Sequence, residues 1–166
     1  LKEMLKEWGI EECSAVGTPC SREEGERVEK VIEDQGRMGR YRRAAAKLNY
    51  MALDDPRIAF ASKLISQGMA KPTEEGEARI KRALRFMRGW PVCEWGFGWQ
   101  DMPTHLVGYS DSDWAGCPRT RRSTSGGGIM WGTHLLTHWS RTQSCVALSS
   151  GEAELNGMLK AASEGL

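Results

Sequence analysis

The sequence lacks the features that place a chain in a membrane or send it for secretion. No apolar run approaches the ~18 residues that span a bilayer, and no segment has the charged and then apolar pattern of a signal peptide. Net charge is also nearly absent, because 23 Lys and Arg residues oppose 22 Asp and Glu residues and leave a formal charge of +1 at pH 7. No overall field therefore draws the chain to nucleic acid or to a membrane. We expect a soluble chain without a membrane partner, in which any contact with nucleic acid is local.

The five cysteines do not form a metal-binding or disulfide framework. Their number is odd, they are widely scattered, and there is no CxxC pair of the kind that chelates zinc or exchanges disulfides. The sequence favours reduced thiols in an intracellular protein.

The length allows one ordinary domain or two small ones, since 166 residues with 40% hydrophobic content are enough to bury a core. The sequence opens at Leu1 without an initiator Met and stops at Leu166 inside a stretch with a helical pattern. From these two ends we expect part of a longer chain.

The first hundred residues have mainly helical patterns. Apolar residues at helical spacing, strong helix formers and Gly or Pro breakers predict the boundaries. The predicted helices cover residues 1–8, 41–52, 57–68 and about 74–88. Turn-forming residues predict a loop over 13–25, and 26–40 is charged and weakly helical.

From about residue 95 the pattern changes to short strands punctuated by Gly and Ser. The predicted strands cover residues 106–111, 123–131 and 135–142. A helix follows, with Ser149 and Glu152 at the spacing of a capping box. Its predicted buried stripe consists of Leu155, Met158, Leu159 and Ala162. The fold class is therefore α/β of the α+β type, with an antiparallel three-strand meander and one helix after a helical region.

Two acidic positions are candidates for chemistry. Asp111-Ser112-Asp113 ends an apolar strand, where a carboxylate projects from a rigid scaffold, although Asp is also common in turns for local hydrogen-bonding reasons. Glu152 and Glu154 lie in the first turn of the last helix, where the helix dipole alone explains negative charge. Glu154 neighbours the predicted stripe and would point along the seam between helix and sheet, which makes it a candidate ligand.

Three motifs in a fixed order make a resemblance specific. They are GYSDSDWAG at 108–116, RRSTSG at 121–126 and VALSSGEAE at 146–154. Together they closely resemble the ribonuclease H domain of copia-type LTR retrotransposons. Upstream, the sequence resembles the reverse-transcriptase tail of the same Pol polyprotein at YRRAAAKLNYMAL (41–53), PRIAFA (56–61), PTEE (72–75) and RALRFMRG (82–89). The resemblance covers nearly the whole chain.

The resemblance implies hydrolysis of the RNA strand of an RNA·DNA hybrid by two divalent metal ions, Mg²⁺ or Mn²⁺. By motif position it implies that Asp111 and Glu154 are catalytic metal ligands and that Asp113 is not. The family has two further carboxylates beyond the point where this sequence stops. The implied partners are the hybrid and the remainder of the Pol polyprotein, in a cytoplasmic particle or the nucleus.

Basic and hydroxyl side chains near these motifs are weaker candidates for contact with nucleic acid. Arg121 and Arg122 suit phosphates, although a solvated hairpin turn is the favoured interpretation of a short basic run that also includes Arg119. Ser149 and Ser150 are also candidates.

Other conspicuous residues have structural interpretations. The GGG run at 126–128 lacks the Gly-Lys-Ser/Thr of a phosphate loop, so we expect close strand packing. His134 and His138 would share a face, but no third zinc ligand lies near them in sequence. Linker or core packing is also favoured over base stacking for Trp90, Trp95 and Trp99.

The sequence thus predicts a reverse-transcriptase tail over residues 1–100 and the first half of a ribonuclease H-like domain over 101–166. We expect the carboxylates of Asp111 and Glu154 to lie close together on one side of the sheet, and residues 1–166 alone to be inactive. A three-strand sheet also leaves an edge that favours aggregation. The alternative is a non-catalytic relic or interaction module. A simple nucleic-acid binder is disfavoured by the near-zero net charge.

Overall fold

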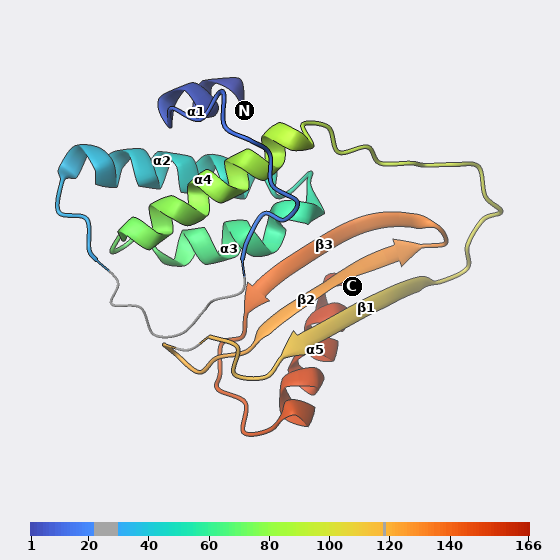
Figure 1. Cartoon of the computed structure of the whole chain (residues 1–166). Coiled ribbons are helices and arrows are strands. Elements are labelled where there is room, and N and C mark those ends of the chain that lie inside the picture. Colours follow the sequence, from blue (N-terminus) through green and yellow to red (C-terminus); the bar gives the residue numbers. More distant parts are fainter. Residues whose placement is uncertain (22–29, 118) are drawn as a thin grey trace. The chain divides into compact units, whose positions relative to one another are not determined.

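The computed structural model describes residues 1–21, 30–117 and 119–166, and the chain divides into two compact units, Leu1–Glu94 and Trp95–Leu166. The first unit is helical, and the second contains an antiparallel sheet of three strands and one helix (Figure 1). The expected mixed fold class is confirmed. None of the helices in the described residues is long and apolar enough to cross a membrane.

The two longest helices of the first unit begin at polar caps. The helices of this unit are α1 (Lys2–Glu7), α2 (Gln35–Met51), the 3-10 turn η1 (Pro56–Ile58), α3 (Ala59–Gln67) and α4 (Glu74–Gly89). The Asp34 carboxylate accepts the Arg37 amide at the start of α2, and the Thr73 hydroxyl accepts the Gly76 amide at the start of α4. Helix α2 covers most of the helix predicted at 41–52 and also the last residues of the weakly helical stretch at 26–40. The part of that stretch before residue 30, and residues 22–25 of the predicted loop, lie outside the described residues.

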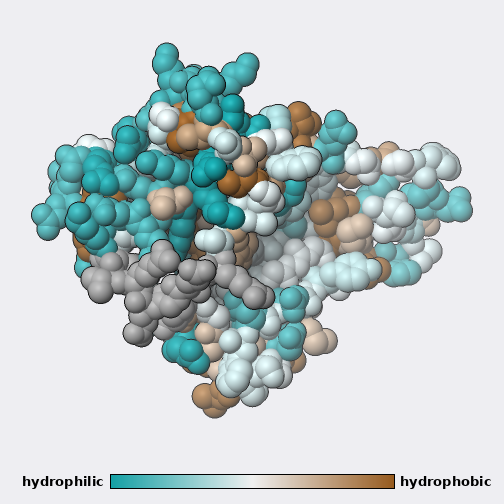
Figure 2. Space-filling model, in the orientation of Figure 1, coloured by the Kyte–Doolittle hydropathy of each residue, from teal (hydrophilic) through white to brown (hydrophobic). Residues whose placement is uncertain are grey.

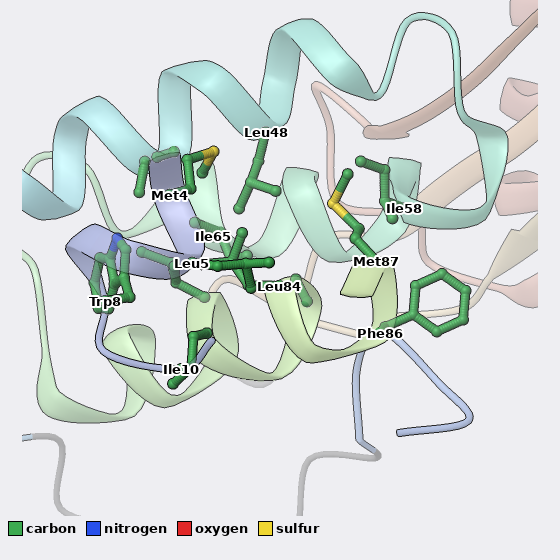
Figure 3. Close-up of a cluster of buried hydrophobic side chains, with 14 of the residues drawn as sticks. Met4, Leu5, Trp8, Ile10, Leu48, Ile58, Ile65, Leu84, Phe86 and Met87 are labelled. Atoms are coloured by element: carbon green, nitrogen blue, oxygen red, sulfur yellow. The ribbon is translucent and has the colours of Figure 1, made fainter. Parts of the chain in front are cut away.

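The core of this unit is an apolar cluster to which every helix contributes (Figure 3). Tyr41 of α2 is buried in it, and its hydroxyl donates a 2.7 Å hydrogen bond to the Ile65 carbonyl of α3. A Cβ at Gly68 or Gly76 would clash with the Tyr41 ring. The two glycines therefore make room for the tyrosine that ties α2 to its neighbours.

Arginines of α4 hold the N-terminal segment that follows α1. Arg82 donates to the Thr18 hydroxyl at 2.8 Å, Arg85 donates to the Ser14 carbonyl at 2.8 Å, and Arg88 donates to the Cys13 carbonyl. Figure 2 shows mainly hydrophilic side chains over the visible face of this unit. These three guanidinium groups serve the fold itself.

The second unit is a meander with one covering helix. Strands β1 (Leu106–Asp113), β2 (Thr124–Trp131) and β3 (His134–Thr142) pair in the order β1-β2-β3, and α5 (Ser150–Glu164) packs against β1 and β2. All three predicted strands are confirmed, with β1 two residues longer than expected. Gly132, at φ +60, makes the tight turn between β2 and β3.

The glycine run in β2 serves close packing, as predicted. A Cβ at Gly127 would clash with the Tyr109 carbonyl and the Trp139 ring, and one at Gly128 would lie 2.9 Å from Leu135. Side chains of neighbouring strands fill the space that the glycines leave open.

The predicted buried stripe of α5 is wrong. The helix buries Ala153, Gly157 and Ala161, whereas Leu155 is 55% and Leu159 61% exposed. The cause is the sheet surface beneath the middle of α5, where Ser110, Ser112 and Ser125 lie, so that a Cβ at Gly157 would be 3.6 Å from the Ser110 hydroxyl. Only small helix residues fit at that separation.

Candidate active site

The two candidate carboxylates lie toward the same end of the second unit. Asp111 is near the C-terminal end of β1, and Glu154 is in the second turn of α5. The Trp114 indole, just beyond β1, donates a 3.1 Å hydrogen bond to the Ala147 carbonyl just before α5. Figure 1 shows the tip of β1 and the start of α5 near each other.

The structure does not place the two side chains on one side of the sheet. Ser110 and Ser112 face α5, since both lie within 4 Å of a Cβ built at Gly157. The β1–β2 ladder is regular through this stretch, and successive side chains of a strand point to opposite faces. Asp111 therefore projects from the face opposite to α5, and the expectation that it would meet Glu154 is wrong for the described residues. Both side chains are exposed.

Neighbouring acidic residues have structural roles. The Glu152 carboxylate accepts the Leu148 amide at 2.7 Å, and the Ser149 hydroxyl accepts the Glu152 amide at 3.2 Å, which is the predicted capping box. Asp113 accepts the Thr124 amide at the start of β2. Ser150 is exposed in the first turn of α5.

These donors do not assemble a metal site by themselves. Among the described residues there is no group of three or more His, Cys, Asp or Glu side chains that could hold a metal ion. Mg²⁺ keeps most of its water unless several oxygen ligands converge on it. Asp111 and Glu154, on different faces, therefore do not form an assembled Mg²⁺ site with the other described residues.

The basic turn between β1 and β2 is exposed to solvent. Arg119, Arg121 and Arg122 are all exposed, and Arg121 has a left-handed backbone with φ +56. Nearby, burial raises the pKa of the Cys117 thiol, but hydrogen bonds from Thr120 and charge from Arg119 lower it by more, so the pKa falls below its usual value. The predicted turn is confirmed, and contact with nucleic acid stays a prediction.

Each of the two histidines packs against an aromatic ring of the segment before β1. Of the tryptophans for which packing was predicted, Trp95 makes such a contact, whereas Trp90 is 58% exposed. Trp95 lies with its ring centroid 6.0 Å from that of His138, and Phe97 meets His134 edge-on at 5.2 Å. β3 has an irregularity where it passes Ile129 and Met130, and the two histidines pair with Trp131 and Gly128. Trp95 and Phe97 stack on each other at 6.4 Å, so both histidines contact one aromatic pair. Trp99 is 97% exposed.

A polar cluster between the sheet and α5 escaped the sequence patterns. Gln143 donates from Nε2 to the Ser125 hydroxyl at 2.9 Å and to the Ala153 carbonyl at 2.8 Å, and Asn156 reaches Gln143 at 3.5 Å. Hydrophobic periodicity does not detect such residues. The available signal was that Ser110 and Ser112 are two positions apart on one strand and therefore share a face.

Known proteins resemble this chain along most of its length. The chain is 37% identical over 124 residues to the Retrovirus-related Pol polyprotein from transposon RE1 of Arabidopsis thaliana, which covers 75% of this chain and 8% of that protein. It is 27% identical over 163 residues to the Uncharacterized mitochondrial protein AtMg00810 of the same plant, covering 98% of this chain and 67% of that protein.

A third relative has a different description. The chain is 35% identical over 115 residues to the Secreted RxLR effector protein 161 of Plasmopara viticola, covering 69% of this chain and 80% of that protein. No family model and no solved structure matches the chain.

Fold and motifs indicate a retroelement-derived α/β protein. The chain is homologous to the retrovirus-related Pol polyproteins of copia-type transposons. It spans less than a tenth of the RE1 polyprotein.

Proposed function

We propose that this chain is the part of a Pol polyprotein in which the tail of a reverse transcriptase joins the first half of a ribonuclease H-like domain. The parent polyprotein would hydrolyse the RNA strand of RNA·DNA hybrids. The observation that carries the proposal is the order of elements in the second unit: an antiparallel meander, an Asp near the end of its first strand, and a Glu in the helix that follows.

Residues 1–166 do not perform this reaction alone. Asp111 and Glu154 project from different faces, so neither is positioned to share a metal ion with the other. In the longer polyprotein, further segments would have to reposition or supplement these carboxylates. Mg²⁺ or Mn²⁺ is the cofactor proposed for that longer protein, because hard carboxylate oxygens suit these ions.

The proposed partners are an RNA·DNA hybrid and the remainder of the Pol polyprotein, inside the cell in a cytoplasmic particle or the nucleus. Arg121 and Arg122 are exposed in the turn that follows β1 and are free to meet a phosphate backbone. Ser149, by contrast, already uses its hydroxyl oxygen as the cap of α5.

A non-catalytic interaction module is the second candidate. The separation of the two carboxylates favours it, and so does the relative described as a secreted effector. In this case the second unit would retain the meander as a scaffold, without a nuclease role for Asp111 or Glu154.

Cleavage of a labelled RNA·DNA hybrid by the longer polyprotein distinguishes these candidates. Asp111→Asn and Glu154→Gln keep side-chain shape and remove charge, and each should lower the cleavage rate at least about 100-fold, because a metal-binding carboxylate stabilises charge in the transition state. Asp101→Asn, an exposed carboxylate in the segment before β1, is the matched control and should cleave normally. Full activity of both test variants would reject the proposed site, and an inactive parent would favour the module.

A further inference from the structure

The segment that leads into β1 is held against the β2–β3 turn by one side chain. Gln100 accepts at Oε1 from the Thr133 amide at 2.8 Å and from the Thr133 hydroxyl at 3.0 Å, and it donates from Nε2 to the Trp131 carbonyl at 3.0 Å. The Trp131 indole in turn donates to the Pro103 carbonyl at 3.2 Å. The turn is shaped for this contact, since a Cβ at Gly132 would clash with the Gln100 amide.

The backbone fixes the orientation of the Gln100 amide. An amide N–H only donates and a carbonyl only accepts, so the atom facing the Thr133 N–H must be oxygen and the atom facing the Trp131 carbonyl must be nitrogen. Turning the amide over would set its N–H group against the Thr133 N–H, which is also a donor. It would also set its oxygen against the Trp131 carbonyl, which is also an acceptor. Gln100 is therefore held in one orientation.

That orientation also fixes the proton on His134. The ring Nε2 lies 2.8 Å from the Gly98 carbonyl, so it must carry a proton and donate. The ring Nδ1 lies 3.2 Å from Gln100 Nε2, which is a donor, so Nδ1 must accept. The arrangement requires a neutral imidazole with its proton on Nε2.

We propose that His134 and Gln100 form a proton-sensitive latch on the segment at 98–103. A second proton on His134 would place an N–H group against the N–H group of Gln100. The Gln100 amide cannot turn over in response without losing its hydrogen bonds to Thr133 and Trp131. The latch is closed while the ring is neutral and opens when the ring takes up a second proton, which frees the segment at 98–103 from the β2–β3 turn.

The charged groups around His134 do not offset a second proton. Asp101 is the charged residue of the segment at 95–103, and it is exposed. Strand β2 has no ionisable side chain, β1 has Asp111 and Asp113 at the end away from His134, and β3 adds His138 and Arg141. Within the described residues, the hydrogen-bond partners of the ring are Gly98 and Gln100.

The first test needs no variant. The ¹⁵N chemical shifts of the His134 ring in residues 1–166 at pH 7.5 report which nitrogen carries the proton. The latch requires a protonated Nε2 and a bare Nδ1. A proton on Nδ1 at this pH, or rapid exchange between the two tautomers, would overturn the proposal.

The second test follows hydrogen exchange of the Thr133 amide and the Trp131 indole, corrected for the intrinsic effect of pH. Protection should fall at least about tenfold between pH 7.5 and 5.5. His134→Asn removes the ring that gains the second proton, so protection should differ little between the two pH values. His105→Asn changes an exposed histidine whose Nδ1 lies 3.1 Å from the Thr104 hydroxyl, and it should keep the wild-type response. Equal protection of the wild type at both pH values, or the wild-type response in His134→Asn, contradicts the latch.

Discussion

At the scale of single residues, the helical unit depends on the nearly buried carboxylate of Glu77 in α4. Arg37 Nη2 lies 2.6 Å from one of its oxygens, and Arg40 Nη2 lies 3.4 Å from the other. Burial raises the pKa of Glu77, but hydrogen bonds and charge from Arg37 and then Arg40 lower it by more, so the pKa lies below its usual value. The ionised form is therefore the one that stabilises the fold.

Replacing Glu77 by Gln should lower the free energy of unfolding by about 2 kcal/mol at pH 7, because charge-assisted hydrogen bonds to two guanidinium groups are lost. The folded pKa is depressed, so this contribution is fully present above the unfolded-state pKa of about 4.3 and is lost as the pH falls through the folded value. Denaturant titrations of wild type and variant at pH 7 and pH 3.5 measure both effects.

The control for this prediction is Glu75→Gln, which removes a more exposed i,i+4 pair with Arg79 at 3.0 Å. Such pairs contribute about 0.3–0.5 kcal/mol. A loss in Glu77→Gln no larger than in the control, or one that grows in acid, would contradict the role given to Glu77.

At the scale of elements, the small residues of β1, β2 and α5 determine how closely helix and sheet approach. Ala153 is fully buried against the sheet, so Ala153→Leu should cost about 1–3 kcal/mol through overpacking. The double variant Leu155→Gln, Leu159→Gln changes exposed side chains and should alter stability by no more than about 0.5 kcal/mol per site. Thermal melts of the two variants test which face of α5 is buried. A larger loss of stability in the double variant than in Ala153→Leu would support the buried face predicted from the sequence.

The middle strand gives a second prediction at this scale. Gly127→Val should destabilise the second unit by at least about 2 kcal/mol, because its Cβ would meet backbone on one side and the Trp139 ring on the other. Gly126→Ala is the neighbouring control, since its nearest contact is an ordinary 3.9 Å to the Trp139 carbonyl. Near-UV circular dichroism during unfolding follows the Trp139 environment. Equal effects of the two substitutions would show that β2 tolerates side chains on both faces.

Local patterns predicted the elements well and their packing poorly. The strands and the capping box at Ser149 and Glu152 depend on nearby residues, which a sequence displays directly. The buried face of α5 depends on the sheet surface opposite it, which a helical pattern in isolation does not contain. Large apolar residues at helical spacing therefore predicted the wrong face.

At the scale of the whole molecule, the positions of Asp111 and Glu154 also depend on how distant segments pack. The motifs correctly place Asp111 near a strand end and Glu154 in the following helix, but convergence of their side chains depends on strand parity relative to Ser110 and Ser112. A shift of one residue exchanges the two faces of a strand. The family resemblance and the order of elements follow from the sequence. The arrangement of the carboxylates depends on which face of β1 packs against α5, and the sequence does not show this.

The central claim is that residues 1–166 contain catalytic motifs of a Pol polyprotein without an assembled catalytic site. The most direct measurement is a gel assay of a labelled RNA·DNA hybrid incubated with residues 1–166 and abundant Mg²⁺. We predict no cleavage above background, because Asp111 and Glu154 lie on different faces and the described residues bring no third ligand to either. Metal-dependent cleavage that disappears in Asp111→Asn would contradict the account and show that this segment completes its own site.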